Sequence, residues 1–197
     1  MKKMHSILQA YSQHSYYVKG IGTRWFDKYL FGWIGLGVAS KVMTGYRIVL
    51  RHLKEYPDAG IYVFGFSRGS YIARSLVAML DNSGASFDVE PGEIFKLYKK
   101  RKKVSLAGAI HPTIKFLGLF DTVAAMGIPG LSKLYEKSFG FKDHKLTSNV
   151  TNAVHILAKD ENRKVFNYVP LEDELGRVNV VAVNGDHSDI GGGHFKN

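Results

Sequence analysis

The sequence contains no cysteine among its 197 residues, and this absence removes several kinds of chemistry at once. Without thiols the chain cannot form disulfides, thiolate zinc sites or iron–sulfur clusters, and it cannot use a cysteine nucleophile. Proteins without cysteine occur in reducing and oxidising surroundings alike. The cysteine count therefore excludes chemistry but does not identify a compartment.

Long apolar runs are also absent. No run approaches the ~18–20 residues that a membrane-spanning helix needs, because glycine or charge interrupts the longest candidates. The N-terminus carries two lysines, but His5, Gln9, Ser12 and Gln13 interrupt the apolar stretch that a secretory signal requires. We therefore expect a chain that is cytoplasmic in its producing cell and that leaves it, if at all, without a signal peptide.

Acidic residues are scarce relative to basic ones. The chain has 27 Lys and Arg against 17 Asp and Glu, a formal net charge of +10. Such a surplus favours polyanionic partners, namely nucleic acid or anionic membrane surfaces. The sequence carries no nucleic-acid recognition motif, so we expect no nucleic-acid partner.

The densest basic cluster comprises Lys96 and residues 99–103, interleaved with Phe95, Leu97 and Tyr98. The simpler interpretation is a solvated helix end. The functional interpretation is attraction to anionic phospholipid headgroups, with the apolar side chains dipping into the interface. The residues we expect to face a membrane are Lys99, Lys100, Lys102 and Lys103.

The length and the composition, 45% hydrophobic and 22% charged, indicate one globular domain over residues 1–197. Apolar spacing predicts helices over about 36–53, from the serine motif described below to Gly84, over about 91–103 and over about 150–162. Short apolar or β-rich runs predict strands at 15–19, 60–65, 113–120 and 178–183. Strands that alternate with helices indicate an α/β fold with a largely parallel sheet. Residues 127–140 are the least regular stretch, and we expect a loop over the site.

The clearest chemical motif is G-x-S-x-G at residues 65–69, between a predicted strand and a predicted helix. In a nucleophile elbow the serine sits on a strained turn, and small neighbours let the strand and helix approach closely. We therefore expect Ser67 to be a nucleophile, with Gly65 and Gly69 as supporting residues. The following helix directs its first N–H groups at a developing oxyanion, so the Arg68 N–H is the expected first donor. The alternative is a glycine-flanked turn with a solvated serine.

An acid and a histidine follow the serine in the order typical of α/β-hydrolases. Asp121 ends one predicted strand and His187 ends another, which places both at the same sheet edge as Ser67. His187 is then the general base, and Asp121 orients its imidazole.

Each of these residues has a competing interpretation. Asp121 could instead cap a helix. Asp186 and Asp189 are rival acids, but both lie too near His187 in sequence to reach round it easily, so we assign Asp189 a supporting role. His187, Asp189 and His194 could be imagined as metal ligands, but their spacing matches no familiar zinc motif, and we expect no metal and no cofactor. We expect the glycines at 191–193 to make room for substrate.

Five blocks, at residues 17–23, 63–74, 118–123, 155–163 and 187–193, together resemble the α/β-hydrolase catalytic domain of type VI secretion phospholipase effectors. The resemblance implies hydrolysis of phospholipid esters, with Ser67, Asp121 and His187 at the matching positions. It also implies a phospholipid membrane, a secretion spike and immunity proteins as partners. His155 and Arg163 lie in one of the blocks, and we expect them to be a buried polar support and its partner.

The chain departs from that family in two places. The family usually opens with a strand ending in D-G-T that helps to build the oxyanion hole, and no such block precedes Tyr17. Residues 20–23 could substitute, so we take Gly22 as the candidate second donor. The chain also stops 10 residues after His187 (197 − 187), which suggests a domain shorter than the family's at both ends. Two functions follow: an antibacterial lipase effector, or an inactive hydrolase remnant that binds lipid or protein.

Overall fold

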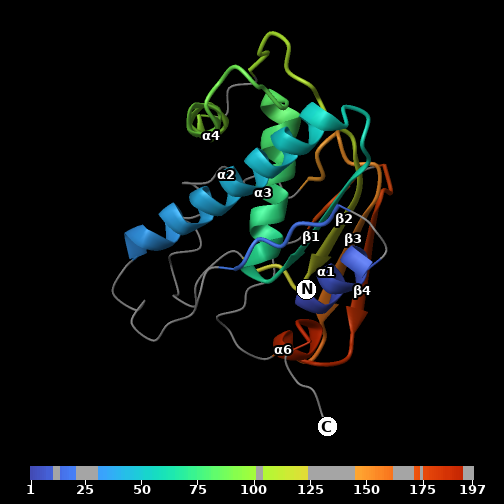
Figure 1. Ribbon diagram of the computed structural model, residues 1–197. Coiled ribbons are helices and arrows are strands. Elements are labelled where there is room, and N and C mark those ends of the chain that lie inside the picture. The colour runs from blue at the N-terminus through green and yellow to red at the C-terminus, as the bar shows by residue number, and fades with distance from the viewer. Residues whose placement is uncertain are drawn as a thin grey trace.

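The computed structural model describes residues 1–10, 14–20, 31–100, 104–123, 145–161, 171–173 and 175–192. Within these ranges the chain forms a four-stranded sheet in the order β1-β2-β3-β4. The strands are β1 (Ile61–Phe66), β2 (Ile114–Phe120), β3 (Ala153–Ala158) and β4 (Val178–Val183). All neighbouring pairs are parallel, so the carboxyl ends of the strands meet at one edge (Figure 1). The predicted α/β fold with a parallel sheet is confirmed.

The helices are α1 (Lys2–Ala10), α2 (Phe31–Glu55), α3 (Arg68–Ser83), α4 (Pro91–Lys99) and the short α6 (His187–Ile190). α3 packs on β1 and β2, α2 packs on α3, and α4 packs on both α2 and α3. In Figure 1 these three helices lie beside one face of the sheet, whereas α6 lies beyond the carboxyl ends of the strands. Among the described helices, none is both long and apolar enough to cross a membrane.

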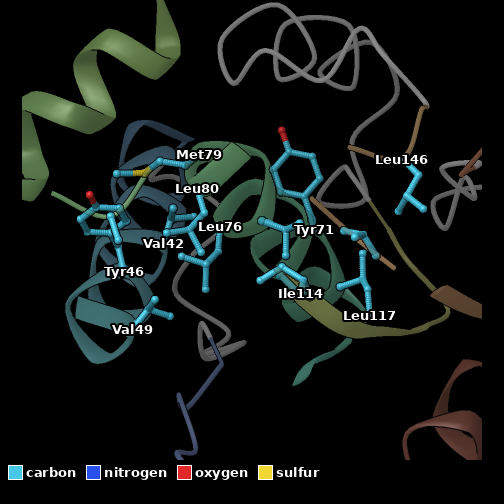
Figure 2. Close-up of a cluster of buried hydrophobic side chains, with 14 of the residues drawn as sticks. Val42, Tyr46, Val49, Tyr71, Leu76, Met79, Leu80, Ile114, Leu117 and Leu146 are labelled. Carbon is cyan, nitrogen blue, oxygen red and sulfur yellow. The ribbon is translucent and has the colours of Figure 1, made fainter. Parts of the chain in front are cut away.

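The core lies between α2, α3 and the sheet, as Figure 2 shows. Along α2 the buried side chains recur every three or four residues, at Val38, Val42, Tyr46, Val49 and Leu53. This spacing gives the helix one apolar face. That face meets Leu76, Met79 and Leu80 of α3, and α3 in turn covers Ile114 and Leu117 of β2. The helices predicted before Pro57 and before Gly84 are confirmed.

The structure corrects the prediction for residues 150–162, since the described part of this range, residues 150–161, contains a strand and no helix. Their apolar residues at 150, 153, 154 and 157 match helical spacing, but the same stretch is also a short run of the kind that forms a strand buried on both faces. Its carbonyl and N–H groups pair with β2 on one side and with β4 on the other. The hydrogen bonds offered by the two neighbouring strands therefore determine that this segment is a strand. The spacing of its apolar residues alone does not distinguish a strand from a helix.

The strand predicted at residues 15–19 is also wrong, since residues 14–20 join no sheet. A β-rich sequence becomes a strand only where another strand offers hydrogen bonds. Here the aromatic side chains contact the last turns of α2: the ring of His14 lies 5.0 Å from that of His52, and the ring of Tyr16 lies 6.3 Å from it. Residues 14–20 therefore form an irregular segment whose aromatic side chains pack against α2.

Tyr46 joins α2 to the turn that follows α3. Its side chain is fully buried, and its hydroxyl donates to the Gly84 carbonyl at 3.0 Å and accepts from the Ser86 N–H at 2.9 Å. Burial raises the pKa of Tyr46, so the hydroxyl stays neutral. Two buried backbone groups therefore depend on one side-chain oxygen.

We expect Tyr46→Phe to lower the free energy of unfolding by about 1–3 kcal/mol, because it leaves those two backbone groups without a partner. Guanidinium-induced unfolding measures the change. Tyr62→Phe is the matched control, since Tyr62 on β1 is 64% exposed and its loss should cost no more than about 0.5 kcal/mol. Equal losses in the two variants would contradict the role given to Tyr46.

Candidate active site

Ser67 occupies a strained turn between β1 and α3. Its backbone has φ 58° and ψ −125°, a conformation that residues other than glycine rarely adopt. Two hydrogen bonds hold the turn: the Ser67 N–H donates to the Phe120 carbonyl at 2.8 Å, and the Ser67 carbonyl accepts from the Ser70 N–H at 3.0 Å. The turn places the serine at the carboxyl edge of the sheet, as in a nucleophile elbow.

Gly65 provides the space that this turn needs. A Cβ atom at Gly65 would lie 2.5 Å from the Gly69 carbonyl oxygen and from the N and Cα atoms of Ser70, all of them backbone atoms. The expectation that Gly69 is also needed for close packing is wrong for the part of the chain that the structure describes, because a Cβ atom there would meet none of its atoms within 4 Å. The strand and helix approach each other at the side of Gly65 alone.

His187 and Asp121 complete a hydrogen-bonded row with Ser67. The Nε2 atom of His187 lies 2.8 Å from Ser67 Oγ, and its Nδ1 atom lies 2.6 Å from Asp121 Oδ2. His187 and Asp121 are each only 7% exposed, so water screens their contact weakly. The structure thus brings together the three residues that the sequence selected as nucleophile, base and acid.

Asp121 is held by the strand next to its own. It follows β2 directly with φ 44°, its N–H donates to the Ile156 carbonyl at 2.7 Å, and its Oδ1 accepts from the Ala158 N–H at 3.0 Å. The side chain therefore bonds to β3 and to His187. These contacts make Asp121 a buried hydrogen-bond acceptor, and the residues of the helix that it could cap, from 124 on, lie outside the described residues.

His187 reaches Asp121 by crossing the end of β3, which separates β2 from β4. Gly185 has φ 118° and turns the chain, and its N–H donates to Asp160 Oδ2 at 2.7 Å. The His187 N–H donates to Glu161 Oε2 at 3.3 Å, and α6 packs against β3. The residues that follow β3 therefore direct the histidine back over the sheet.

The rival acids hold α6 together. Asp186 Oδ1 accepts from the N–H groups of Ser188 and Asp189 at 2.7 and 3.0 Å, and Asp189 Oδ2 accepts from the Asp186 N–H at 2.9 Å. This reciprocal capping box fixes the first turn of the helix that carries His187. Asp189 is a supporting residue in this geometric sense. His194 lies outside the described residues, and within them no group of three or more His, Asp and Glu is placed to hold a metal ion.

His155 lies beneath the acid, inside the sheet. It is fully buried at the centre of β3, beside Leu119 of β2 and Val180 of β4. Its pKa falls to about 4, first because burial disfavours the charged ring, then because the Arg74 guanidinium repels it, while Asp121 opposes the shift. His155 is therefore neutral at pH 7. Arg74, 4% exposed on α3, is a buried charge that the sequence analysis did not select.

The structure gives less information on the remaining candidate site residues. Arg68 is the first residue of α3, where N–H groups of the first turn face the site. Gly22, Arg163, Lys102, Lys103 and the stretch 127–140 lie outside the described residues. Lys99 and Lys100 are exposed at the end of α4, and Figure 1 shows α4 and α6 at opposite ends of the molecule. A membrane-facing role for these lysines stays a prediction, with the constraint that they lie far from the serine.

We expect Gly65→Ala to abolish labelling of Ser67 by a fluorophosphonate and to lower stability by roughly 1–3 kcal/mol, because backbone atoms of α3 would have to move. Gly69→Ala should leave the thermal unfolding temperature unchanged or slightly raise it, since the methyl group meets open space and alanine favours a helix. Labelling assays and thermal unfolding measure these effects. Unchanged labelling in Gly65→Ala would show that the turn does not need a glycine there.

His155 gives a prediction for acid stability. Its pKa is about 4 in the folded chain and near 6.5 in the unfolded chain, so the unfolded chain binds more protons between these values. The free energy of unfolding therefore falls as the pH drops from 6.5 to 4, by up to about 3 kcal/mol from this group. His155→Gln should show a shallower decline in chemical denaturation measured across that range. Parallel curves for the two proteins would contradict the buried, neutral state of His155.

Comparisons with known proteins relate the chain to one family and to two longer proteins. The family described as "T6SS, Phospholipase effector Tle1-like, catalytic domain" matches residues 2–197. Among curated proteins, "Uncharacterized protein YEL023C" of Saccharomyces cerevisiae is 24% identical over 204 residues, covering 83% of this chain and 28% of that protein. Among solved structures, "Structure of the Tle1 effector bound to the VgrG spike from the Type 6 secretion system" is 28% identical, has a TM-score of 0.48, and is matched over 78% of this chain and 30% of that chain.

The chain therefore spans less than a third of the length of each of these two relatives. The family match, by contrast, extends over nearly the whole sequence, from residue 2 to residue 197. It includes Ser67, Asp121 and His187, which the structure brings into contact. The chain belongs to the family of Tle1-like catalytic domains of type VI secretion phospholipase effectors.

Proposed function

We propose that this chain is a serine hydrolase that cleaves carboxylic ester bonds of phospholipids, with Ser67 as nucleophile, His187 as general base and Asp121 as the orienting acid. One observation carries the proposal: Ser67 Oγ, His187 and Asp121 form a continuous row with contacts of 2.8 and 2.6 Å at the carboxyl edge of the sheet. Membership of a family of phospholipase catalytic domains supports the lipid ester as substrate.

Acylation begins when His187 Nε2 takes the proton of Ser67 Oγ and the oxygen attacks the ester carbonyl. With its proton on Nδ1, the imidazole donates to Asp121, which leaves Nε2 free to act as the base. The Asp121 carboxylate stabilises the imidazolium that forms. The attack creates a tetrahedral intermediate whose oxygen carries a negative charge.

The first turn of α3 is suited to stabilise that oxyanion. The helix begins at Arg68 and runs to Ser83, so its dipole places positive potential beside Ser67. The Arg68 N–H is the first proposed donor, and Gly22 is proposed as the second. When the intermediate collapses, the imidazolium gives its proton to the leaving alcohol of the lipid, and the acyl group stays on Ser67.

Deacylation repeats these steps with water. His187 Nε2 removes a proton from a water molecule, the hydroxide attacks the acyl-serine, and collapse returns the proton to Ser67 Oγ. The products are a fatty acid and a lipid that has lost one acyl chain. Every proton transfer in this sequence passes through one nitrogen, which explains why the orientation of His187 matters.

We propose that the lipid is met in a membrane and that the exposed lysines of α4 add long-range attraction to anionic surfaces. Lys99 is the last residue of α4, and Figure 1 shows α4 at the end of the molecule opposite α6, so we propose that these lysines do not hold the lipid under attack. Their contribution would be screened by salt. Family membership is also the support for an antibacterial role, for delivery into a target cell by a secretion spike, and for an immunity protein as a further partner.

We expect Ser67→Ala to abolish ester hydrolysis and fluorophosphonate labelling without a loss of thermal stability, because the hydroxyl serves chemistry and the strained backbone needs no larger side chain. The assay follows fatty acid release from phosphatidylglycerol vesicles and from a soluble short-chain ester. Ser105→Ala is the control, since Ser105 is exposed in a loop and should retain full activity.

The same assay addresses the alternative of an inactive remnant that binds lipid or protein. Only an activated serine reacts with a fluorophosphonate, so a wild-type chain that folds and binds vesicles but takes no label would support that alternative. Turnover that survives in Ser67→Ala would instead exclude Ser67 as nucleophile.

A further inference from the structure

The aromatic ring of Phe66 lies against the imidazole of His187. The two ring centroids are 4.7 Å apart and the ring planes are inclined by 30°, a stacked arrangement. Phe66 is the last residue of β1 and precedes Ser67 directly. One dipeptide therefore supplies both the nucleophile and a surface on which the base rests.

The same ring also contacts the far end of α6. A Cβ atom at Gly191 would overlap Phe66 Cζ and would lie 2.7 Å from Cε1. Gly191 has an ordinary φ of −74°, so its backbone conformation does not require glycine. The nearby ring of Phe66 does require it, because the ring occupies the space of a Cβ atom. The expectation that this glycine makes room for substrate is therefore revised: Gly191 makes room for Phe66.

These contacts complement the hydrogen bonds of His187. Asp121 and Ser67 fix the two ring nitrogens within the plane of the imidazole, but two hydrogen bonds along one line leave the ring free to tilt about that line. Phe66 covers a face of the ring and limits the tilt. The capping box fixes the backbone of His187 in the first turn of α6, whereas Phe66 restrains its side chain.

We infer that Phe66 is a positioning residue that braces His187 and that Gly191 lacks a side chain in order to admit the bracing ring. The inference rests on the proposed serine hydrolase function. In this role Phe66 acts through the histidine, whose Nε2 lies 2.8 Å from Ser67 Oγ.

β1 contains a matched control. Phe64 lies two residues before Phe66, on the same face of the strand, and it too packs over a glycine: a Cβ atom at Gly118 would lie 2.5 Å from Phe64 Cδ1. Its ring neighbour is Phe116, at 5.7 Å between centroids. Phe64→Leu therefore removes the same atoms from an equivalent environment one step further from His187.

We expect Phe66→Leu to lower kcat by about tenfold or more with little change in KM, because a misaligned base slows each proton transfer but not lipid binding. Fluorophosphonate labelling of Ser67 should slow by a similar factor. Phe64→Leu should lower the unfolding temperature as much as Phe66→Leu does and leave kcat and labelling near wild type. If the two variants have the same kcat, the positioning role is overturned.

Gly191→Ala tests the second half of the inference. Alone it should lower kcat as Phe66→Leu does, because the methyl group displaces the ring. Added to Phe66→Leu it should cost little more, since the smaller side chain vacates the space that the methyl group enters. Losses that multiply in the double variant would overturn the contact as the cause.

These experiments distinguish a failure of the role given to Phe66 from a failure of the proposed hydrolase function. Activity that persists in Ser67→Ala would remove the hydrolase mechanism itself. An inactive Ser67→Ala together with a fully active Phe66→Leu would leave the mechanism in place and overturn only the role of Phe66.

Discussion

The backbone of Phe120 is the point on which the geometry of the site depends. Its carbonyl accepts from the Ser67 N–H at 2.8 Å and from Ser70 Oγ at 3.1 Å, and its N–H donates to Ser70 Oγ at 3.2 Å. The first turn of α3 is thus fastened to the last residue of β2. Because Asp121 is the next residue, these hydrogen bonds constrain the distance from Ser67 to Asp121 independently of His187.

α3 contributes to the site along its length as well as at its N-terminus. Ser67, Ser70 and Arg74 follow one another at helical spacing, so they lie on the side of α3 that faces the sheet. Ser70 and Arg74 are buried there, together with His155 from β3. A polar layer therefore lies between helix and sheet directly under Asp121, and its members are chemically neutral or basic.

The sequence predicted the structure best at positions where the backbone conformation is compatible with few residue types. The G-x-S-x-G turn needs glycine at position 65 and a flanking strand and helix, and all three features could be recognised. Asp121 and His187 could be predicted because strand ends at the same edge of a parallel sheet meet. β3 could not be predicted, because its pattern fits a helix as well as a buried strand and only the pairing with β2 and β4 decides between them.

Contacts between segments far apart in the sequence were the other features that the sequence did not predict. Gly69 was predicted to resemble Gly65 because both flank the serine, yet among the described residues Gly65 meets neighbouring backbone atoms and Gly69 meets none. Phe66 carried no signal of its own, since a phenylalanine at the end of a buried strand is ordinary. Its contact with Gly191 and His187 depends on α6 folding back over β3, which no local pattern encodes.

Ser67 and Asp121 share one further property: within the described part of the chain, they are the residues other than glycine that have a positive φ. Each of these conformations costs roughly 1–3 kcal/mol, and glycine would adopt either one without strain. The chain thus gives up stability at the two positions where a hydroxyl and a carboxylate are needed. Glycine at either position would relieve the strain but would remove the hydroxyl or the carboxylate that the proposed mechanism uses, so stability and the proposed chemistry compete at these two turns.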